Sequence, residues 1–186
     1  MPRNRRPRDP AEKQAEIVAA ARRLFLEQGY EAVSMTRIAR EAGVVSNTVY
    51  WYFQDKDAVL IAVLDDVLAE AMDRYDVVAQ VELVDRLVWV VGELEQMSRL
   101  VTTVHARARE SVTVGEWHDR FHALAEGLFR IELAELGFAE HDLDSVISMG
   151  VFVVEGLLMH PRDEAGKRAV VSTLVRSARA LVVTTG

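Results

Sequence analysis

Three short polar residues, Ser46, Asn47 and Thr48, stand just after a glycine and just before a run of aromatic side chains. Side chains of this kind can hydrogen-bond to base edges when the first turns of a helix enter the major groove of DNA. Tyr50 can contact a base methyl group or a phosphate. The chemistry that this stretch favours is therefore recognition of a DNA duplex.

Groups that could hold the DNA backbone flank these residues on both sides. Thr36 and Arg37 begin the preceding predicted helix and can reach a phosphate or a guanine edge. Tyr52 and Lys56 are placed to bind phosphates, where the N-terminus of the following helix adds its dipole. Trp51 could pack in the core or stack on the sugar–phosphate backbone, and we favour a phosphate-facing edge.

Two short helices hinged on Gly43 are needed to present these side chains. Ser34 can cap the first helix, which runs to Ala42, and the second covers about 47–53. The residues expected to form the core that fixes the crossing of the two helices are Ile38, Ala39, Val44, Val49 and Phe53. This is the layout of a helix-turn-helix.

The stretch resembles the DNA-binding region of the tetracycline-repressor (TetR) family. The residues that carry the resemblance are Ile38-Ala39, Ala42-Gly43-Val44, Thr48-Val49-Tyr50-Trp51-Tyr52-Phe53, Lys56 and Leu60, with Phe25 and Gly29-Tyr30 before them. The rest of the chain is similar to the family only in being all-helical with two apolar final helices. The resemblance implies an all-α fold, with an N-terminal three-helix helix-turn-helix domain and a larger C-terminal helical domain for ligand binding and dimerisation.

One position departs from the family pattern. Members commonly carry a polar residue where this chain has Val45, and a valine side chain cannot cap a helix. Either Ser46 caps the recognition helix, which then starts one residue late, or the cap is missing. The departure leaves open which of Ser46 and Asn47 faces the bases.

Charge is divided unevenly along the chain. The net charge is −7, but residues 1–60 hold ten Lys/Arg against eight Asp/Glu, and residues 61–186 hold twelve against twenty-one. The net charges of the two parts are thus +2 and −9. Arg3, Arg5, Arg6 and Arg8 form a basic arm that could follow phosphates, enter a minor groove or remain a solvated tail. DNA contact is therefore expected only at the N-terminal end.

Composition excludes several other classes of protein. The chain has no cysteine, which excludes disulfides, a thiol nucleophile and cysteine-based zinc sites. Its start lacks the apolar core of a secretory signal, and its apolar runs are too short to span a membrane. We expect a cytoplasmic protein with no membrane partner.

Apolar residues recur at helical spacing through almost the whole chain, and no strand pattern appears. Nine helices are predicted, the later ones at about 81–100, 103–114, 117–136, 142–159 and 164–183, with Gly115, Gly137 and His160-Pro161 between them. The predicted domains are a basic arm at 1–10, the helix-turn-helix domain at 11–55 and an effector-binding and dimerisation domain at 56–186.

Aromatic and polar side chains of the larger domain either belong to its core or line a pocket. The candidates for effector binding are Trp89, His105, Trp117, Phe121, Phe152 and Glu155. Glu155 interrupts the run GVFVVEGLLM, so we expect it to be partly buried with a partner, either an arginine or a ligand.

His118 and His122 lie four residues apart and so share a helix face, with Glu116 and Asp119 nearby. Such a pair could hold a metal ion or simply lie at the surface. Because the sequence fixes no third ligand, we predict no metal and no cofactor.

The last two predicted helices are apolar on more than one face. The residues concerned are Ile147, Gly150, Val151, Val154, Leu157 and Leu158 on the first helix, and Val171, Leu174, Val175, Ala178 and Val182 on the second. This pattern fits a four-helix interface between two copies. The alternative is one larger core within a single chain.

These observations predict a homodimeric transcriptional regulator, with a repressor expected, which binds a palindromic DNA operator and responds to a small-molecule effector. A ligand-independent architectural DNA-binding protein is the first alternative. A helical-bundle enzyme is the second, and the sequence lacks a nucleophile–base pair, a carboxylate–histidine set or a phosphate loop to support it. The acidic, aromatic-rich C-terminal part favours a sensor.

Overall fold

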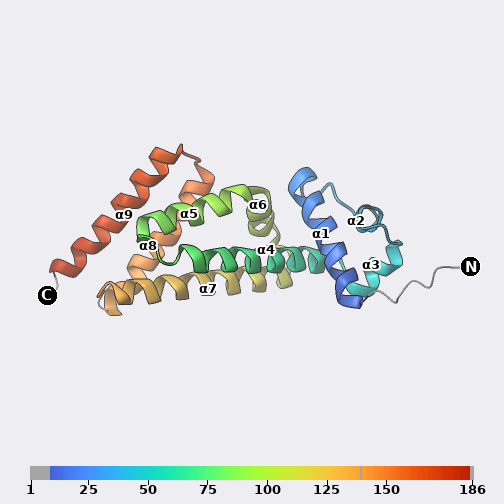
Figure 1. Ribbon diagram of the computed structural model, residues 1–186, viewed down its shortest axis with the longest axis horizontal. Helices are drawn as coiled ribbons and strands as arrows, with labels where there is room; N and C mark the ends of the chain where they lie inside the picture. Colours follow the sequence, from blue (N-terminus) through green and yellow to red (C-terminus); the bar gives the residue numbers. More distant parts are fainter. Residues whose placement is uncertain (1–8, 139, 185–186) are drawn as a thin grey trace, which may run out of the picture. The chain divides into compact units, whose positions relative to one another are not determined.

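The computed structural model describes residues 9–138 and 140–184 (Figure 1). Within these residues the chain forms nine α-helices and no strand, which confirms the predicted all-α fold. The helices are α1 (Pro10–Gln28), α2 (Met35–Glu41), α3 (Ser46–Tyr52), α4 (Lys56–Val78), α5 (Leu83–Gln96), α6 (Ser98–Arg107), α7 (Val112–Glu135), α8 (Glu140–Met159) and α9 (Glu164–Thr184). No helix of the described part is both long and apolar enough to cross a membrane.

The chain forms two compact units. Unit 1 takes in the residues up to Met72 together with Arg99–Trp117, and unit 2 comprises Asp73–Ser98 and His118–Gly186. The chain passes between the units at three points, inside α4, after the first residue of α6 and inside α7. The predicted division between a DNA-binding domain and an effector domain at residues 55 and 56 stays a prediction. The predicted basic arm also stays a prediction, because its four arginines lie outside the described residues.

Helix α1 has the ends that its sequence favours. The Asp9 carboxylate accepts a hydrogen bond of 3.0 Å from the Ala11 amide, and Pro10 occupies the first turn, where its missing N–H costs no intrahelical bond. Gly29 follows the helix with φ of +82° and donates its N–H to the Phe25 carbonyl. Both ends therefore form where the sequence places them.

The predicted break at Gly115 is wrong, because α7 runs through this residue. The Gly115 N–H donates to the Ser111 carbonyl at 2.9 Å, as in any helical turn. A Cβ atom at this position would lie 3.1 Å from the Ala108 carbonyl oxygen. Glycine thus permits a close approach of two backbone segments here and does not end the helix. The helix predicted at 81–100 is likewise divided, at Met97, into α5 and α6.

The core of unit 2 joins α5 to both of the last two helices. Its first cluster contains Leu83, Leu87, Val88, Val91, Leu157, Val171 and Val175, and its second contains Leu133, Phe138, Leu143, Val146, Ile147 and Ala178. Several apolar residues that suggested a dimer interface are therefore buried within one chain. The side chain of Val182 lies outside those that the structure describes.

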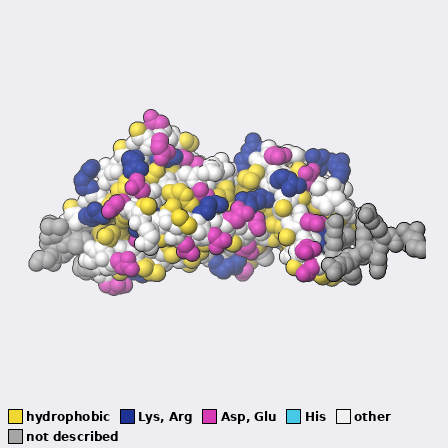
Figure 2. All heavy atoms as spheres, in the orientation of Figure 1, with side chains coloured by type: hydrophobic (Ala, Val, Ile, Leu, Met, Phe, Trp, Pro, Cys, Tyr) yellow, Lys and Arg dark blue, Asp and Glu magenta, His cyan; other side chains and the backbone are white. Residues whose placement is uncertain are grey.

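Part of the apolar surface of α8 nevertheless remains exposed. Met149, Phe152 and Met159 recur at helical spacing on this helix, and Phe152 and Met159 are 69% and 75% exposed. Apolar side chains also reach the surface among charged ones on the face shown in Figure 2. A single chain thus covers one side of α8 and leaves this stripe, Met149, Phe152 and Met159, uncovered.

Candidate nucleic-acid interface and cavity

Helix α2 and the turn after it are fixed by local hydrogen bonds. The Ser34 hydroxyl accepts from the Arg37 amide at 3.2 Å, so Ser34 caps the helix as predicted. Gly43 adopts φ of +65°, a left-handed conformation that residues with a Cβ rarely adopt. The Val44 N–H then returns to the Ala39 carbonyl at 2.9 Å. This turn sets the direction in which the chain enters α3.

Helix α3 starts at Ser46, without a side-chain cap. Val45 occupies the cap position and makes no side-chain hydrogen bond, so the missing cap is the alternative that holds. Only the backbone closes the first turn, where the Thr48 N–H donates to the Val45 carbonyl at 2.9 Å. The Val45 side chain is 70% exposed. An uncapped start of this kind is typically weaker by about 1 kcal/mol than one with Ser or Thr.

The two faces of α3 differ in chemistry. Val49 is buried on the inner face, where Ile38, Ala39 and Phe53 are also buried. Asn47, Tyr50 and Trp51 lie three and four residues apart and are exposed, Tyr50 by 54% and Trp51 by 73%. We call these three residues the recognition face.

The other predicted DNA-binding residues lie around the recognition face with less exposure. Ser46, Thr48 and Tyr52 are half-buried, and the Tyr52 ring meets the Trp51 ring edge-on at 4.6 Å. Thr36 is exposed. Arg37 is half-buried, with its Nε atom buried and without a hydrogen-bond partner. Their contacts with DNA stay predictions.

The start of α4 is capped and carries the predicted phosphate ligand. The Asp55 carboxylate accepts from the Ala58 amide at 2.8 Å, as its position before the helix predicts. The Lys56 ammonium donates to the Tyr30 carbonyl at 3.0 Å and lies 4.0 Å from the centre of the Tyr30 ring. Lys56 is thus held beside the helix start, with two of its three N–H donors left for another acceptor.

A partly buried ion pair attaches α6 to the start of α4. Arg107 donates to both oxygens of Asp57, at 2.6 and 3.3 Å, and the Tyr30 hydroxyl also donates to Asp57. Burial acts to raise the pKa of Asp57, but hydrogen bonds from Arg107 and Tyr30 outweigh it and hold the pKa below its ordinary value. The sequence did not single out Asp57, because an acidic residue in a first helical turn is common on dipole grounds alone.

Comparison with known proteins identifies this arrangement. The family described as "Bacterial regulatory proteins, tetR family" matches residues 17–63. This range contains the later part of α1, all of α2 and α3, and the start of α4. HbdR, an HTH-type transcriptional regulator of Aromatoleum sp. (strain CIB), is 36% identical over 110 residues, which cover 54% of this chain and 46% of HbdR. Residues 17–63 of this chain thus match the DNA-binding region of the TetR family.

Two solved structures share the fold of this chain. A putative TetR-family transcriptional regulator from Mesorhizobium loti MAFF303099 is 22% identical with a TM-score of 0.70, over 95% of this chain and 98% of that one. NalD, the secondary repressor of the MexAB-OprM multidrug efflux pump in Pseudomonas aeruginosa, is 22% identical with a TM-score of 0.66, over 90% and 97%. These likenesses concern the fold alone, and the matched sequence spans less than half of HbdR. HbdR is named as a transcriptional regulator, in agreement with the prediction of a regulator.

The six predicted effector residues are divided between the units. In unit 1, His105 is exposed with Nδ1 2.9 Å from the Val101 carbonyl, and buried Trp117 donates to the Asp65 carboxylate at 2.7 Å. In unit 2, the Trp89 ring lies tilted against the Tyr75 ring, with centroids 6.2 Å apart. Phe121 meets His122 edge-on, and Glu155 lies 3.8 Å from His122. Phe152 belongs to the exposed stripe of α8. The structure therefore brings Phe121 and Glu155 together around His122, and effector binding by the six stays a prediction.

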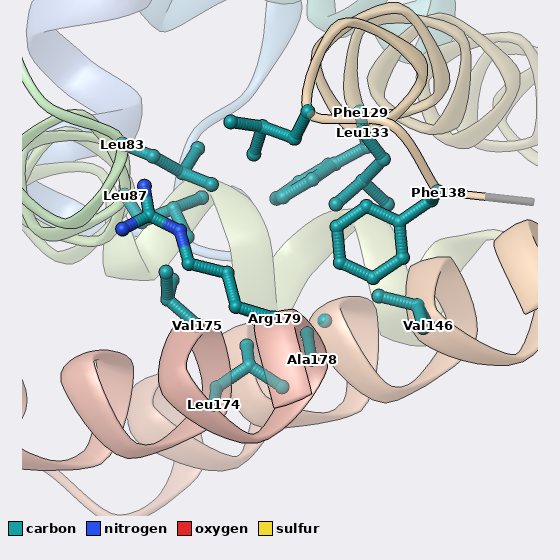
Figure 3. A pocket seen from close by; sticks show the side chains of 12 residues that line it. Leu83, Leu87, Phe129, Leu133, Phe138, Val146, Leu174, Val175, Ala178 and Arg179 are labelled. Atoms are coloured by element: carbon teal, nitrogen blue, oxygen red, sulfur yellow. The ribbon is translucent and has the colours of Figure 1, made fainter. Parts of the chain in front are cut away.

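A cavity in unit 2 is lined by other residues (Figure 3). Its walls are Leu83, Leu87, Phe129, Leu133, Leu136, Phe138, Val146, Gly150, Leu174, Val175, Ala178 and Arg179. Arg179 is the charged residue of this lining. Its side chain extends from α9 toward Leu83 and Leu87 of α5 (Figure 3). The cavity volume is about 20 Å³, which is room for about one water molecule. The sequence could not reveal this site, because its walls come from four helices far apart in the chain.

Proposed function

We propose that this TetR-family protein is a repressor that acts in the cytoplasm, binds a palindromic DNA operator as a homodimer and is released by a small-molecule effector. The observation that carries the proposal is the recognition face. Asn47, Tyr50 and Trp51 point away from a buried core on a helix whose entry angle is fixed by Ser34 and Gly43. An exposed face of this chemistry, on the second helix of a helix-turn-helix, suits base edges and phosphates.

Dimerisation follows from how such a face reads DNA. One short helix contacts only a few base pairs, and two related heads must sit one helical turn apart, at about 34–36 Å, to read a palindrome. The stripe of Met149, Phe152 and Met159 on α8 offers an apolar surface for the second copy. Aromatic and methionine side chains are enriched at such interfaces.

The cavity of unit 2 supports an effector with an apolar body and an acidic group. Its walls are apolar except at Arg179, whose guanidinium could hold a carboxylate through two parallel hydrogen bonds. The cavity must widen to admit such a ligand, so the ligand would favour a different helix arrangement from the one described. A ligand can shift an equilibrium only by this kind of differential affinity.

DNA recognition is tested by selecting a duplex from random sequence with the full chain and then measuring its affinity by fluorescence anisotropy. Tyr50→Ala should weaken specific binding by about 1–3 kcal/mol, with unchanged helical circular dichroism. Val112→Ala is the control, because Val112 is exposed in unit 1 but lies on α7. Equal affinity of the parent and Tyr50→Ala would refute the assignment of the recognition face.

Dimerisation is tested by light scattering at micromolar concentration. The parent should have the mass of a dimer, and Phe152→Arg should have the mass of a monomer with its melting temperature nearly unchanged. Val77→Arg places the same charge at another exposed apolar residue of unit 2 and should stay dimeric. A monomeric parent, or a dimeric Phe152→Arg, would contradict the proposed interface.

The effector is sought by a thermal-shift screen of apolar carboxylic acids. A ligand at 100 times its dissociation constant adds about 2.7 kcal/mol to the free energy of unfolding. Arg179→Met keeps an unbranched, flexible side chain but removes the guanidinium, and it should lose the response to acids. By linkage, operator DNA must weaken the ligand by the same factor by which the ligand weakens operator binding, typically about 5- to 150-fold. A ligand that binds free and operator-bound protein equally tightly would exclude the release mechanism.

A further inference from the structure

Two histidines of α7 turn the same ring atoms toward each other. His118 and His122 lie one helical turn apart in unit 2, both partly buried, and their Nε2 atoms are 3.1 Å apart. Two histidines four residues apart on a helix form a chelating pair, as in the zinc-binding H-E-x-x-H motif. The spacing alone does not establish a site, because a single pair leaves a metal ion with too few protein ligands.

The structure supplies a third donor from another helix. Glu155 of α8 has Oε1 3.8 Å from the Nε2 atom of His122. In a tetrahedral zinc site with metal–ligand distances of about 2.0–2.1 Å, neighbouring donor atoms lie about 3.3 Å apart. The imidazole pair is within a few tenths of this value. The Glu155 carboxylate is close to His122 only, so its side chain, which is partly buried, must rotate toward His118 to complete the site.

A second carboxylate favours the tautomer that metal binding needs. Asp119 has Oδ1 3.6 Å from Nδ1 of His118, on the side of the ring opposite to His122. A negative charge there favours a proton on Nδ1 and leaves the Nε2 lone pair for a ligand. Metal-binding histidines commonly have a carboxylate or carbonyl in this position, which fixes the ring.

We propose that His118, His122 and Glu155 bind a divalent transition metal ion, with Zn²⁺ as the best match to two imidazoles and one carboxylate. Three protein ligands leave one position of a tetrahedral ion for water or a further group. The ion would link α7 to α8 and would stabilise unit 2. This site goes beyond the proposed function, because it requires neither DNA nor the organic effector.

The test uses the full chain without an affinity tag, after treatment with a chelator that is then removed. Co²⁺ is added and its visible absorption is followed, and Zn²⁺ is then titrated in to displace it. The expected result is one ion per chain with the intense absorption of a four-coordinate site. His118→Gln and His122→Gln should each abolish this signal, and Glu155→Gln should weaken binding at least tenfold. His160→Gln removes an exposed histidine just beyond α8 and should leave binding unchanged.

A second measurement on the parent protein does not depend on how the variants fold. Modification of histidines by diethyl pyrocarbonate, mapped by mass spectrometry, should be slowed by Zn²⁺ at His118 and His122 but not at His160. Failure of the parent to bind Co²⁺, or binding that persists when both α7 histidines are replaced, would overturn the site. The short Nε2–Nε2 distance would then be a hydrogen bond between two imidazoles.

Discussion

Helices α3 and α8 both expose an aromatic side chain, yet their surroundings differ. Trp51 of α3 is 73% exposed beside the amide of Asn47 and the hydroxyl of Tyr50, whereas Phe152 of α8 is exposed between two methionines. Hydrogen-bonding neighbours make an aromatic surface suitable for nucleic acid, and soft apolar neighbours make it suitable for another protein surface. The residues around an exposed ring therefore indicate its partner better than the ring itself does.

The largest effect is expected from a substitution on the buried side of α8, in comparison with the same substitution on its exposed stripe. Leu157 is 5% exposed and belongs to the core cluster with Leu83 and Val171. Leu157→Arg would bury an unpaired charge at a cost of several kcal/mol, so we expect loss of the folded state in thermal unfolding. Phe152→Arg at the exposed stripe serves as the comparison and should melt near the parent temperature. A folded, monomeric Leu157→Arg with the parent melting temperature would move Leu157 from the core to the interface.

The second prediction compares one partly buried ion pair in each unit. Arg107 with Asp57 belongs to unit 1, and Arg86 with Glu132, 2.6 Å apart, belongs to unit 2. Asp57→Asn and Glu132→Gln should each lower the free energy of unfolding by about 1.5–3 kcal/mol, since each removes a charged hydrogen-bond partner. Only Asp57→Asn should also weaken operator binding, because Asp57 lies in the first turn of α4 beside Lys56. Equal operator affinities for the two variants would show that this ion pair does not position the DNA-binding helices.

The pH dependence of Asp57→Asn has a definite sign. The pKa of Asp57 is held below its ordinary value, so the carboxylate stabilises the folded state fully at neutral pH. This stabilisation is lost as the pH falls below the ordinary value, near 3.9, toward the lower pKa of the folded state. The difference in melting temperature between the parent and Asp57→Asn should therefore be constant near pH 7 and shrink below about pH 4. A difference that grew on acidification would contradict the assigned direction.

The same two regions show what sequence patterns can and cannot predict. The Ser34 cap, the Gly43 turn and the buried positions of α2 and α3 were all predictable, because the interactions that fix them join residues within about ten positions of each other. The contact of His122 with Glu155 and the walls of the cavity join residues dozens of positions apart. No local pattern encodes such contacts. The break predicted at Gly115 was wrong for a different reason. A glycine that permits the close approach of the Ala108 carbonyl cannot be distinguished in sequence from a glycine that ends a helix.

The next prediction concerns the uncapped start of α3. Val45→Ser places a hydroxyl where it can accept from the amide of residue 47 or 48, which should raise the free energy of unfolding by about 1 kcal/mol. A gain of this size raises the melting temperature of a chain of this length by roughly 2–4 °C. Val45→Ala removes the same exposed methyl groups without supplying a cap and should give no gain. An equal gain for the alanine variant would assign the effect to the lost apolar surface and not to the cap.

The smallest effect is expected at Lys56, and it decides what this side chain does at the DNA. In the free protein the ammonium is held by the Tyr30 carbonyl and lies over the Tyr30 ring, but two of its donors remain for a phosphate. Lys56→Ala should weaken binding to all duplexes alike and reduce the slope of log K against log salt concentration by about one unit. Lys167→Ala is the control, because Lys167 belongs to unit 2, where it pairs with Glu95 and Glu164, and its loss should leave the slope unchanged. If Lys56→Ala kept the slope of the parent while lowering the melting temperature, the role of Lys56 would be confined to Tyr30. The phosphate contact would then fall to the arginines and hydroxyls of unit 1.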